Sequence, residues 1–106
     1  MGAAGADGAP TLVVRVSAIR LTAPARRPVR IPFASSYAAA ARLTLMRNGY
    51  PVVELRMSAT AGANAFIWNG WIGPHRARPG TYTYELTATD ALGRADAMRG
   101  TLQLTR

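Results

Sequence analysis

Residues 80–93 read GTYTYELTATDALG, and this stretch decides the fold class. Apolar side chains at the even positions 82–88 alternate with Thr and Glu at the odd positions, which is the period of a strand with one buried face. Thr and Tyr suit the pleated, half-buried surface of a sheet. Asp90 and Gly93 then stand at the first and last positions of a tight turn. We therefore expect a strand whose Tyr82 and Tyr84 point into a core.

The same period of two continues on both sides of this stretch. Downstream, Ala95, Ala97, Leu102 and Leu104 predict a final strand, in which Gly100 marks a bulge or kink. Upstream, strands at residues 41–47 and 53–58 flank Asn48-Gly49, the residue pair that best tolerates the two positive φ angles of a type I′ hairpin turn.

The N-terminal half is expected to hold two strands. Residues 11–21 alternate as one continuous strand, and residues 29–33 form a short edge strand or strand end because Pro32 cannot donate a backbone hydrogen bond. Residues 35–41 are compatible with one helical turn. Residues 59–64 and 73–80 read as loops around a short strand at 66–68. The chain is thus predicted to be all-β, an antiparallel two-sheet sandwich of about seven strands, with a small closed barrel as the alternative.

Composition limits the chain to one domain. It has 106 residues and no cysteine, so neither a disulfide nor a thiolate metal site is expected. We assign residues 11–106 to a single domain and residues 1–10, which are rich in Gly and Ala, to a flexible tail or linker. Neither a membrane span nor a signal peptide is predicted.

Charge is the main functional signal of the composition. The formal net charge is +8, and all the basic residues are arginine, which is also what a GC-rich genome would encode. The densest group is Arg26, Arg27 and Arg30. It is either an ordinary solvated surface or a patch that binds polyanions.

Two spaced segments resemble a known family. Residues 61–70 (AGANAFIWNG) and 78–93 (RPGTYTYELTATDALG) are similar to the Ig-like domain named for the flagellar hook-capping protein, and the resemblance covers about residues 29–105. It implies a fibronectin type III-like sandwich that is structural or adhesive and belongs to a larger bacterial secreted or cell-surface protein. The chain departs from the family pattern at Asn69, where Asp is commoner, at Trp71 and Ile72, and in the basic residues 75–78.

The motif residues have folding roles of their own. Trp68 is expected inside the core, with its N–H reaching a backbone carbonyl. Asn69 and Gly70 supply positive φ angles, and Gly80 allows a tight entry into the next strand. The hydroxyl of Tyr82 or Tyr84 is expected to bond a loop backbone. The predicted structural residues are Trp68, Asn69, Gly70, Gly80, Tyr82, Tyr84, Asp90 and Gly93.

No catalytic, metal or cofactor site is predicted. His75 is the only histidine, and the five acidic residues are dispersed, so neither a nucleophile with its base nor a set of metal ligands is formed. A Ca²⁺ site at residues 90–96 is the weakly supported alternative. The chain is therefore predicted not to be an enzyme.

Surface aromatic and basic residues are the candidate binding groups. Trp71 either folds back as a lid over the end of the core or forms part of a binding patch. The tentative binding residues are Arg26, Arg27, Arg30, Trp71, Ile72, Arg76 and Arg78. Two functions stay open: a protein-binding assembly module, through self-association or neighbours in a parent chain, and a module for glycans or anionic surfaces. Nucleic acid is not the expected partner, and the expected location is extracellular or the cell surface.

Overall fold

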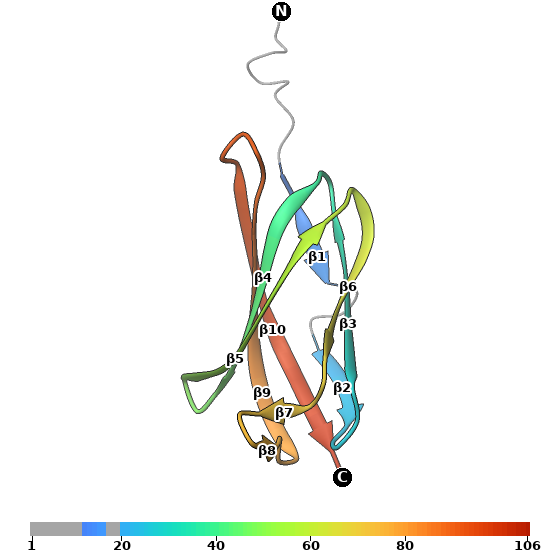
Figure 1. Cartoon of the computed structure of the whole chain (residues 1–106), viewed down its shortest axis with the longest axis vertical. Coiled ribbons are helices and arrows are strands. Elements are labelled where there is room, and N and C mark those ends of the chain that lie inside the picture. The colour runs from blue at the N-terminus through green and yellow to red at the C-terminus, as the bar shows by residue number, and fades with distance from the viewer. Residues whose placement is uncertain (1–11, 17–19) are drawn as a thin grey trace, which may run out of the picture.

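The chain is built from β-strands throughout the part that the structure describes. This computed structural model describes residues 12–16 and 20–106. The strands are β1 (Val14–Val16), β2 (Arg20–Pro24), β3 (Val29–Ser35), β4 (Ala39–Arg47), β5 (Tyr50–Ala59), β6 (Gly62–Trp68), β7 (Trp71–Ile72), β8 (His75–Arg76), β9 (Gly80–Thr89) and β10 (Ala95–Thr105). They form a three-stranded sheet in the order β1-β3-β6, a five-stranded sheet in the order β2-β10-β9-β4-β5, and a small ladder of β7 and β8. Figure 1 shows the two larger sheets as elongated layers, an arrangement compatible with a β-sandwich.

The core consists of apolar residues at alternating strand positions of both larger sheets. In β9 every second residue from Tyr82 to Ala88 is buried, as the alternation predicts. Phe33 and Phe66 stack in the three-stranded sheet with ring centroids 5.2 Å apart. Trp68 of the same sheet meets Tyr82 of the other edge-on at 6.2 Å. Burial of such side chains, worth about 1.5–3 kcal/mol each, holds the two sheets together.

Two predicted turns are confirmed by their backbone geometry. Asn48 and Gly49 have φ angles of 53° and 81°, as a type I′ turn between β4 and β5 requires. In the β9–β10 turn, one carboxylate oxygen of Asp90 accepts hydrogen bonds from the backbone N–H groups of Leu92 (3.0 Å) and Arg94 (2.9 Å). Gly93 of this turn has a φ of 80°. Local sequence chemistry therefore fixes both hairpins.

The prediction of one continuous first strand is wrong. β1 pairs antiparallel with β3 in the small sheet, whereas β2 pairs parallel with β10 in the large sheet. The large sheet is therefore mixed rather than purely antiparallel. Alternation reports only that one face of a strand is buried, and it does not tell which sheet the strand joins. Residues 17–19, which the predicted strand also included, lie outside the described residues.

Pro32 does not mark an edge strand. β3 lies between β1 and β6, and Pro32 pairs with Ala65 of β6. β1 pairs with the other side of β3 as far as Phe33, the residue next to Pro32. The ladder with β6 runs through Pro32 without a break, so a proline here does not restrict β3 to a sheet edge.

The predicted loops and helical turn are shorter than expected or absent. Ala39 and Ala41 are buried in β4, so the helical turn expected at residues 35–41 is wrong. β6 begins at Gly62, within the predicted loop 59–64. The predicted loop at 73–80 contains β8, which pairs with β7. Small residues weaken the alternation signal without preventing strand pairing, which explains the shortfall in predicted strands.

Gly100 does not form a bulge. Its register continues without a break opposite Tyr84, and the register shift lies between Leu45 and Met46 in the β4–β5 ladder. Without a bulge the inward face of β10 stays on even positions. Ala95 and Ala97 are therefore exposed, while Leu102 and Leu104 are buried.

Two further predictions concern the N-terminal tail and a membrane span. The expected tail at residues 1–10 lies outside the described residues. In the ranges that the structure describes, no helix has the length and apolar character needed to cross a bilayer.

Candidate functional site

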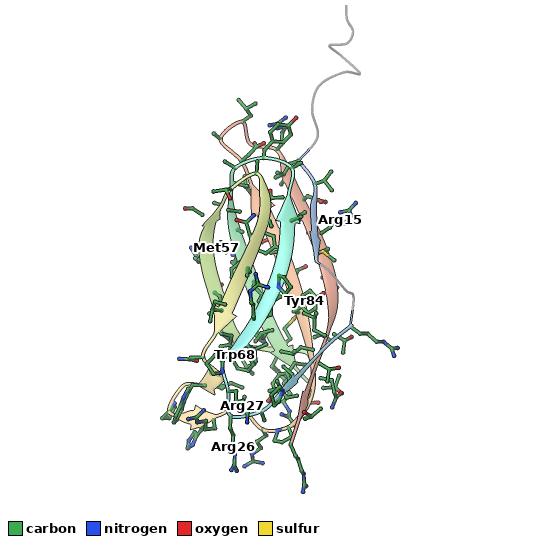
Figure 2. The ribbon with its side chains drawn as sticks, turned by 90° about the vertical axis from the view of Figure 1, so that its right-hand side faces the viewer. Arg15, Arg26, Arg27, Met57, Trp68 and Tyr84 are labelled. Carbon is green, nitrogen blue, oxygen red and sulfur yellow. The ribbon has the colours of Figure 1, made fainter. Side chains whose placement is uncertain are left out.

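From β2 to β6 successive strands reverse direction, and this topology gathers arginines at one end of the molecule. The β2–β3 turn, the β4–β5 turn, the β7–β8 ladder and the last residue all lie at that end (Figure 1). Figure 2 shows Arg26 and Arg27 there, with Arg15 far along the long axis. We call this the basic end, and its basic residues are Arg26, Arg27, Arg30, Arg47, His75, Arg76, Arg78 and Arg106.

The β7–β8 ladder is fixed to the core through Trp68. The indole is 1% exposed, and its Nε1–H donates to the Trp71 carbonyl oxygen at 3.0 Å. Asn69 was expected to have a positive φ, but only Gly70 does, with a φ of 85°. The Asn69 side chain instead accepts a hydrogen bond from the Trp71 N–H at 2.9 Å, which closes the turn by side-chain bonding.

Trp71 is partly covered by a guanidinium group. The Arg76 guanidinium carbon lies 4.7 Å from the centroid of the Trp71 ring, and the residue is 38% exposed. A cation over an indole face is attracted by the ring quadrupole. The aromatic residue therefore lies at the surface with a positive charge stacked on it. It is neither buried as a lid nor fully exposed.

The β2–β3 turn packs directly against this ladder. Arg76 donates through Nη1 to the Arg26 carbonyl oxygen at 2.9 Å. A Cβ atom at Gly70 would lie 2.9 Å from the Arg27 carbonyl oxygen, so only glycine allows the two segments to approach this closely. Arg26 itself has a φ of 68°. These contacts hold Arg26, Arg27 and Arg76 in one surface.

A second group of contacts connects the β4–β5 turn to the segment before β9. The Tyr82 hydroxyl donates to the Arg78 carbonyl oxygen at 2.8 Å and accepts from Nη1 of Arg47 at 2.7 Å. The Arg47 guanidinium carbon also lies 4.9 Å from the Tyr82 ring centroid. Gly80, with a φ of 140°, leaves room for this guanidinium, since a Cβ there would lie 3.0 Å from its Nη2.

These segments border two depressions in the surface. One, of about 640 Å³, is lined by Arg47, Asn48, Ile72, His75, Arg76, Ala77, Arg78 and Tyr82. The other, of about 400 Å³, is lined by Ala25, Arg26, Pro79 and Arg106. Apart from the Tyr82 phenol, every ionisable side chain that lines these two depressions is a base. The basic end thus offers guanidinium donors and an imidazole to an anionic ligand.

The carboxylates of the described residues all form ion pairs elsewhere. The four pairs are Arg15–Asp96, Arg56–Glu54, Arg94–Asp90 and Arg99–Glu85, with nitrogen–oxygen distances of 3.3, 2.7, 2.6 and 3.1 Å. None includes an arginine of the basic end. The basic end therefore has no side-chain carboxylate partner among the described residues, whereas four of the six arginines along the rest of the described molecule are paired with one.

Asp90 is the carboxylate most affected by its surroundings. Burial by itself raises the pKa of this group. Hydrogen bonds from the side chain and backbone of Arg94 and from the backbone of Leu92, together with the charge of Arg94, outweigh burial and hold the pKa below its ordinary value of 3.8. Asp90 and Asp96 are thus both engaged by arginines, which speaks against the Ca²⁺ site considered from the sequence. In residues 12–16 and 20–106, no three His, Asp or Glu side chains gather into a potential metal site.

The structure places the tentative binding residues at the same end. Arg26, Arg27, Trp71, Ile72, Arg76 and Arg78 lie on the turns described above, and Arg30 follows as the second residue of β3. Three further basic residues of this end, Arg47, His75 and Arg106, were not among the predicted binding residues. Arg47 directly precedes the Asn48-Gly49 turn, so counting strand reversals from the hairpins would have placed it at this end.

Comparison with models of protein families gives no match for this chain, and no curated protein matches it.

Proposed function

We propose that the chain is a non-catalytic, structural or assembly module with an Ig-like, fibronectin type III-like topology. Its setting would be a larger bacterial extracellular, cell-surface or flagellar-type protein, where it makes protein–protein contacts. The two larger sheets around one core, with the first two strands in different sheets, are compatible with such a topology. The resemblance of residues 29–105 to the hook-capping Ig-like domain supports the same class.

The observation that carries this proposal is the outer face of the three-stranded sheet. Between Arg30 and the far end of β3, this face consists of small or apolar side chains on β3 and β6. They are Pro32, Ala34, Ala63, Ala65 and Ile67, and Ile67 is 61% exposed. The register brings them together, since Pro32 pairs with Ala65 and Ala34 with Ala63. Arg30, opposite Ile67, and Arg15 of β1, opposite Ala34, border the patch.

Five uncharged side chains lie side by side here, with arginines only at the border, on a chain with a net charge of +8. The central parts of protein interfaces are depleted of charged residues, and contiguous exposed apolar surface marks contact sites. β6 is also an edge strand of this sheet within the described part of the chain, so its free side offers backbone donors and acceptors next to the patch. The patch therefore fits a protein surface better than an ionic ligand.

Binding to flanking segments of the parent protein tests this proposal. Replacing Ile67 with Arg should weaken that binding about tenfold or more, because an apolar side chain buried at an interface contributes about 1.5–3 kcal/mol. Leu92→Arg is the matched control: Leu92 is 78% exposed and lies in the β9–β10 turn, away from the patch. A chain that binds no parent segment would overturn the proposal.

A second candidate function is the binding of an anionic glycan or other anionic surface. The uncompensated arginines of the basic end and the Trp71–Arg76 stack favour it. On a heparin column, Arg27→Gln/Arg78→Gln should elute at clearly lower salt than Arg20→Gln/Arg42→Gln. Both variants have the same net charge, but only the first changes the basic end. Equal elution at low salt would mean that heparin responds to net charge alone and would contradict this candidate.

A further inference from the structure

The long edge strand β5 is a second unpartnered feature. It has ten residues and lies last in the order β2-β10-β9-β4-β5. In the described part of the chain, no strand pairs with its free side. An edge of this length presents a row of backbone donors and acceptors that another strand can pair with.

The outer face of β5 carries a charge pattern that is complementary to itself. Glu54 and Arg56 are exposed neighbours on that face, with Nε of Arg56 2.7 Å from the Glu54 carboxylate. In an antiparallel pair of β5 strands centred on Leu55, Glu54 of one copy lies opposite Arg56 of the other, and the reverse. Opposite charges at directly facing positions stabilise an antiparallel pair, and like charges destabilise it.

The inner face is complementary in the same register. Val53, Leu55 and Met57 are partly buried there and pack against the core. Around a two-fold axis at Leu55, the two Leu55 side chains meet and Val53 faces Met57. The apolar layer would therefore continue from one copy to the next, as an isologous interface requires.

The charges also select this register over its neighbours. An axis at Glu54 would place the two glutamates opposite each other, and an axis at Arg56 would do the same for the arginines. Pro51 cannot donate a backbone hydrogen bond, so it limits the pairing towards the β4–β5 turn.

We propose that β5 pairs antiparallel with β5 of a second copy of this chain, around a two-fold axis at Leu55. The inference rests on the proposed function as an assembly module, and it names a second copy as the partner at this edge. The surface is distinct from the Ile67 patch on β6. The net charge of +8 opposes association over long range. Salt of about 0.15 M screens that repulsion and affects close charge pairs less.

Charge reversal tests the register directly. Glu54→Arg leaves only positive charge at positions 54 and 56, and Arg56→Glu leaves only negative charge. Each variant alone should dimerise about tenfold more weakly than the wild type, measured by sedimentation equilibrium. An equimolar mixture of the two should form a heterodimer, because each position then faces its opposite. The double variant Glu54→Arg/Arg56→Glu should recover the homodimer.

Two control variants make the same changes in net charge away from the edge. Glu85→Arg and Arg99→Glu alter an exposed ion pair between β9 and β10, inside the sheet, and should leave dimerisation unchanged. Circular dichroism would check that every variant keeps its strands.

The outcomes separate this inference from the proposed function. A wild-type chain that stays monomeric at millimolar concentration, or single variants that dimerise like the wild type, would overturn the β5 pairing. Binding of parent segments that depends on Ile67 would survive either result. A dimer abolished by Ile67→Arg and insensitive to charge reversal would place self-association on the outer face and would also overturn the inference.

Discussion

The Tyr82 hydroxyl connects the core to the basic end. Its ring is 1% exposed, while its oxygen both donates to the Arg78 carbonyl and accepts from Arg47. Tyr82→Phe should lower the free energy of unfolding by about 1–2 kcal/mol, because it removes two hydrogen bonds, the one donated to the Arg78 carbonyl oxygen and the one accepted from Arg47. Urea denaturation measures the loss.

A matched hydroxyl deletion is available at Tyr50, which is 73% exposed. Tyr50→Phe should change stability by less than about 0.5 kcal/mol. Equal losses in the two variants would mean that the Arg47–Tyr82–Arg78 contacts do not contribute to stability.

Asp90 makes part of the stability depend on pH. Its pKa is lowered in the folded protein, so the folded state favours the carboxylate. This contribution is complete above the ordinary value of 3.8 and is lost as pH falls from there through the folded-state pKa. Asp90→Asn should therefore show a smaller loss of stability between about pH 6 and pH 2 than the wild type. Denaturation curves across that range provide the comparison, and parallel pH profiles would contradict the prediction.

At the scale of elements, replacing a glycine of positive φ with alanine lowers the free energy of unfolding by an amount that depends on what surrounds it. Gly49→Ala, in the β4–β5 turn, meets no atom within 4 Å, so only the backbone conformation opposes it, at about 1 kcal/mol. Gly70→Ala has a similar φ and also brings Cβ within 2.9 Å of the Arg27 carbonyl oxygen. It should cost about 2–4 kcal/mol, because the β2–β3 turn must move.

Thermal unfolding distinguishes the two glycine variants, since each kcal/mol shifts Tm by about 4–8 °C in a domain of this size. If Gly70→Ala melted at the same temperature as Gly49→Ala, the close approach of the two segments would not be a real constraint.

The sequence predicted some of the strands and turns and missed others. The strand at residues 81–89 and the hairpin at Asn48-Gly49 were predictable because local alternation and turn chemistry define both. β7 and β8 were not, because two-residue strands have no period. Their pairing depends on contacts of the Trp71 carbonyl and the Asn69 side chain.

At the scale of the whole molecule, charge is unevenly distributed. The arginines of the basic end repel one another in the folded state, and the carboxylate ion pairs lie elsewhere. Raising NaCl from about 0.02 to 0.5 M should therefore increase the free energy of unfolding by about 0.5–1 kcal/mol. Arg27→Gln/Arg78→Gln should reduce this salt dependence more than Arg20→Gln/Arg42→Gln. Equal salt dependence in the two variants would contradict an uneven charge distribution.

The candidate site was predictable as a set of residue types and not as a surface. The sequence singled out Trp71 and nearby arginines, but Arg26 and Arg76 are 50 positions apart and meet only through the hydrogen bond to the Arg26 carbonyl. Arg47 and Arg106 join them because strand reversals return the chain to the same end. The apolar face around Ile67 was likewise invisible in sequence, since it depends on the register of β3 with β6.

The sequence by itself determined that this protein is made of strands, where the β4–β5 and β9–β10 hairpins lie and which face of β9 is buried. Those properties depend on neighbours within a few residues along the chain, where alternation and turn chemistry act. Only the tertiary structure decided that β1 and β2 join different sheets, that Pro32 lies in a central strand and that the arginines gather at one end. These depend on pairing between distant segments, and the free energy of that pairing comes from a shared core and not from local pattern.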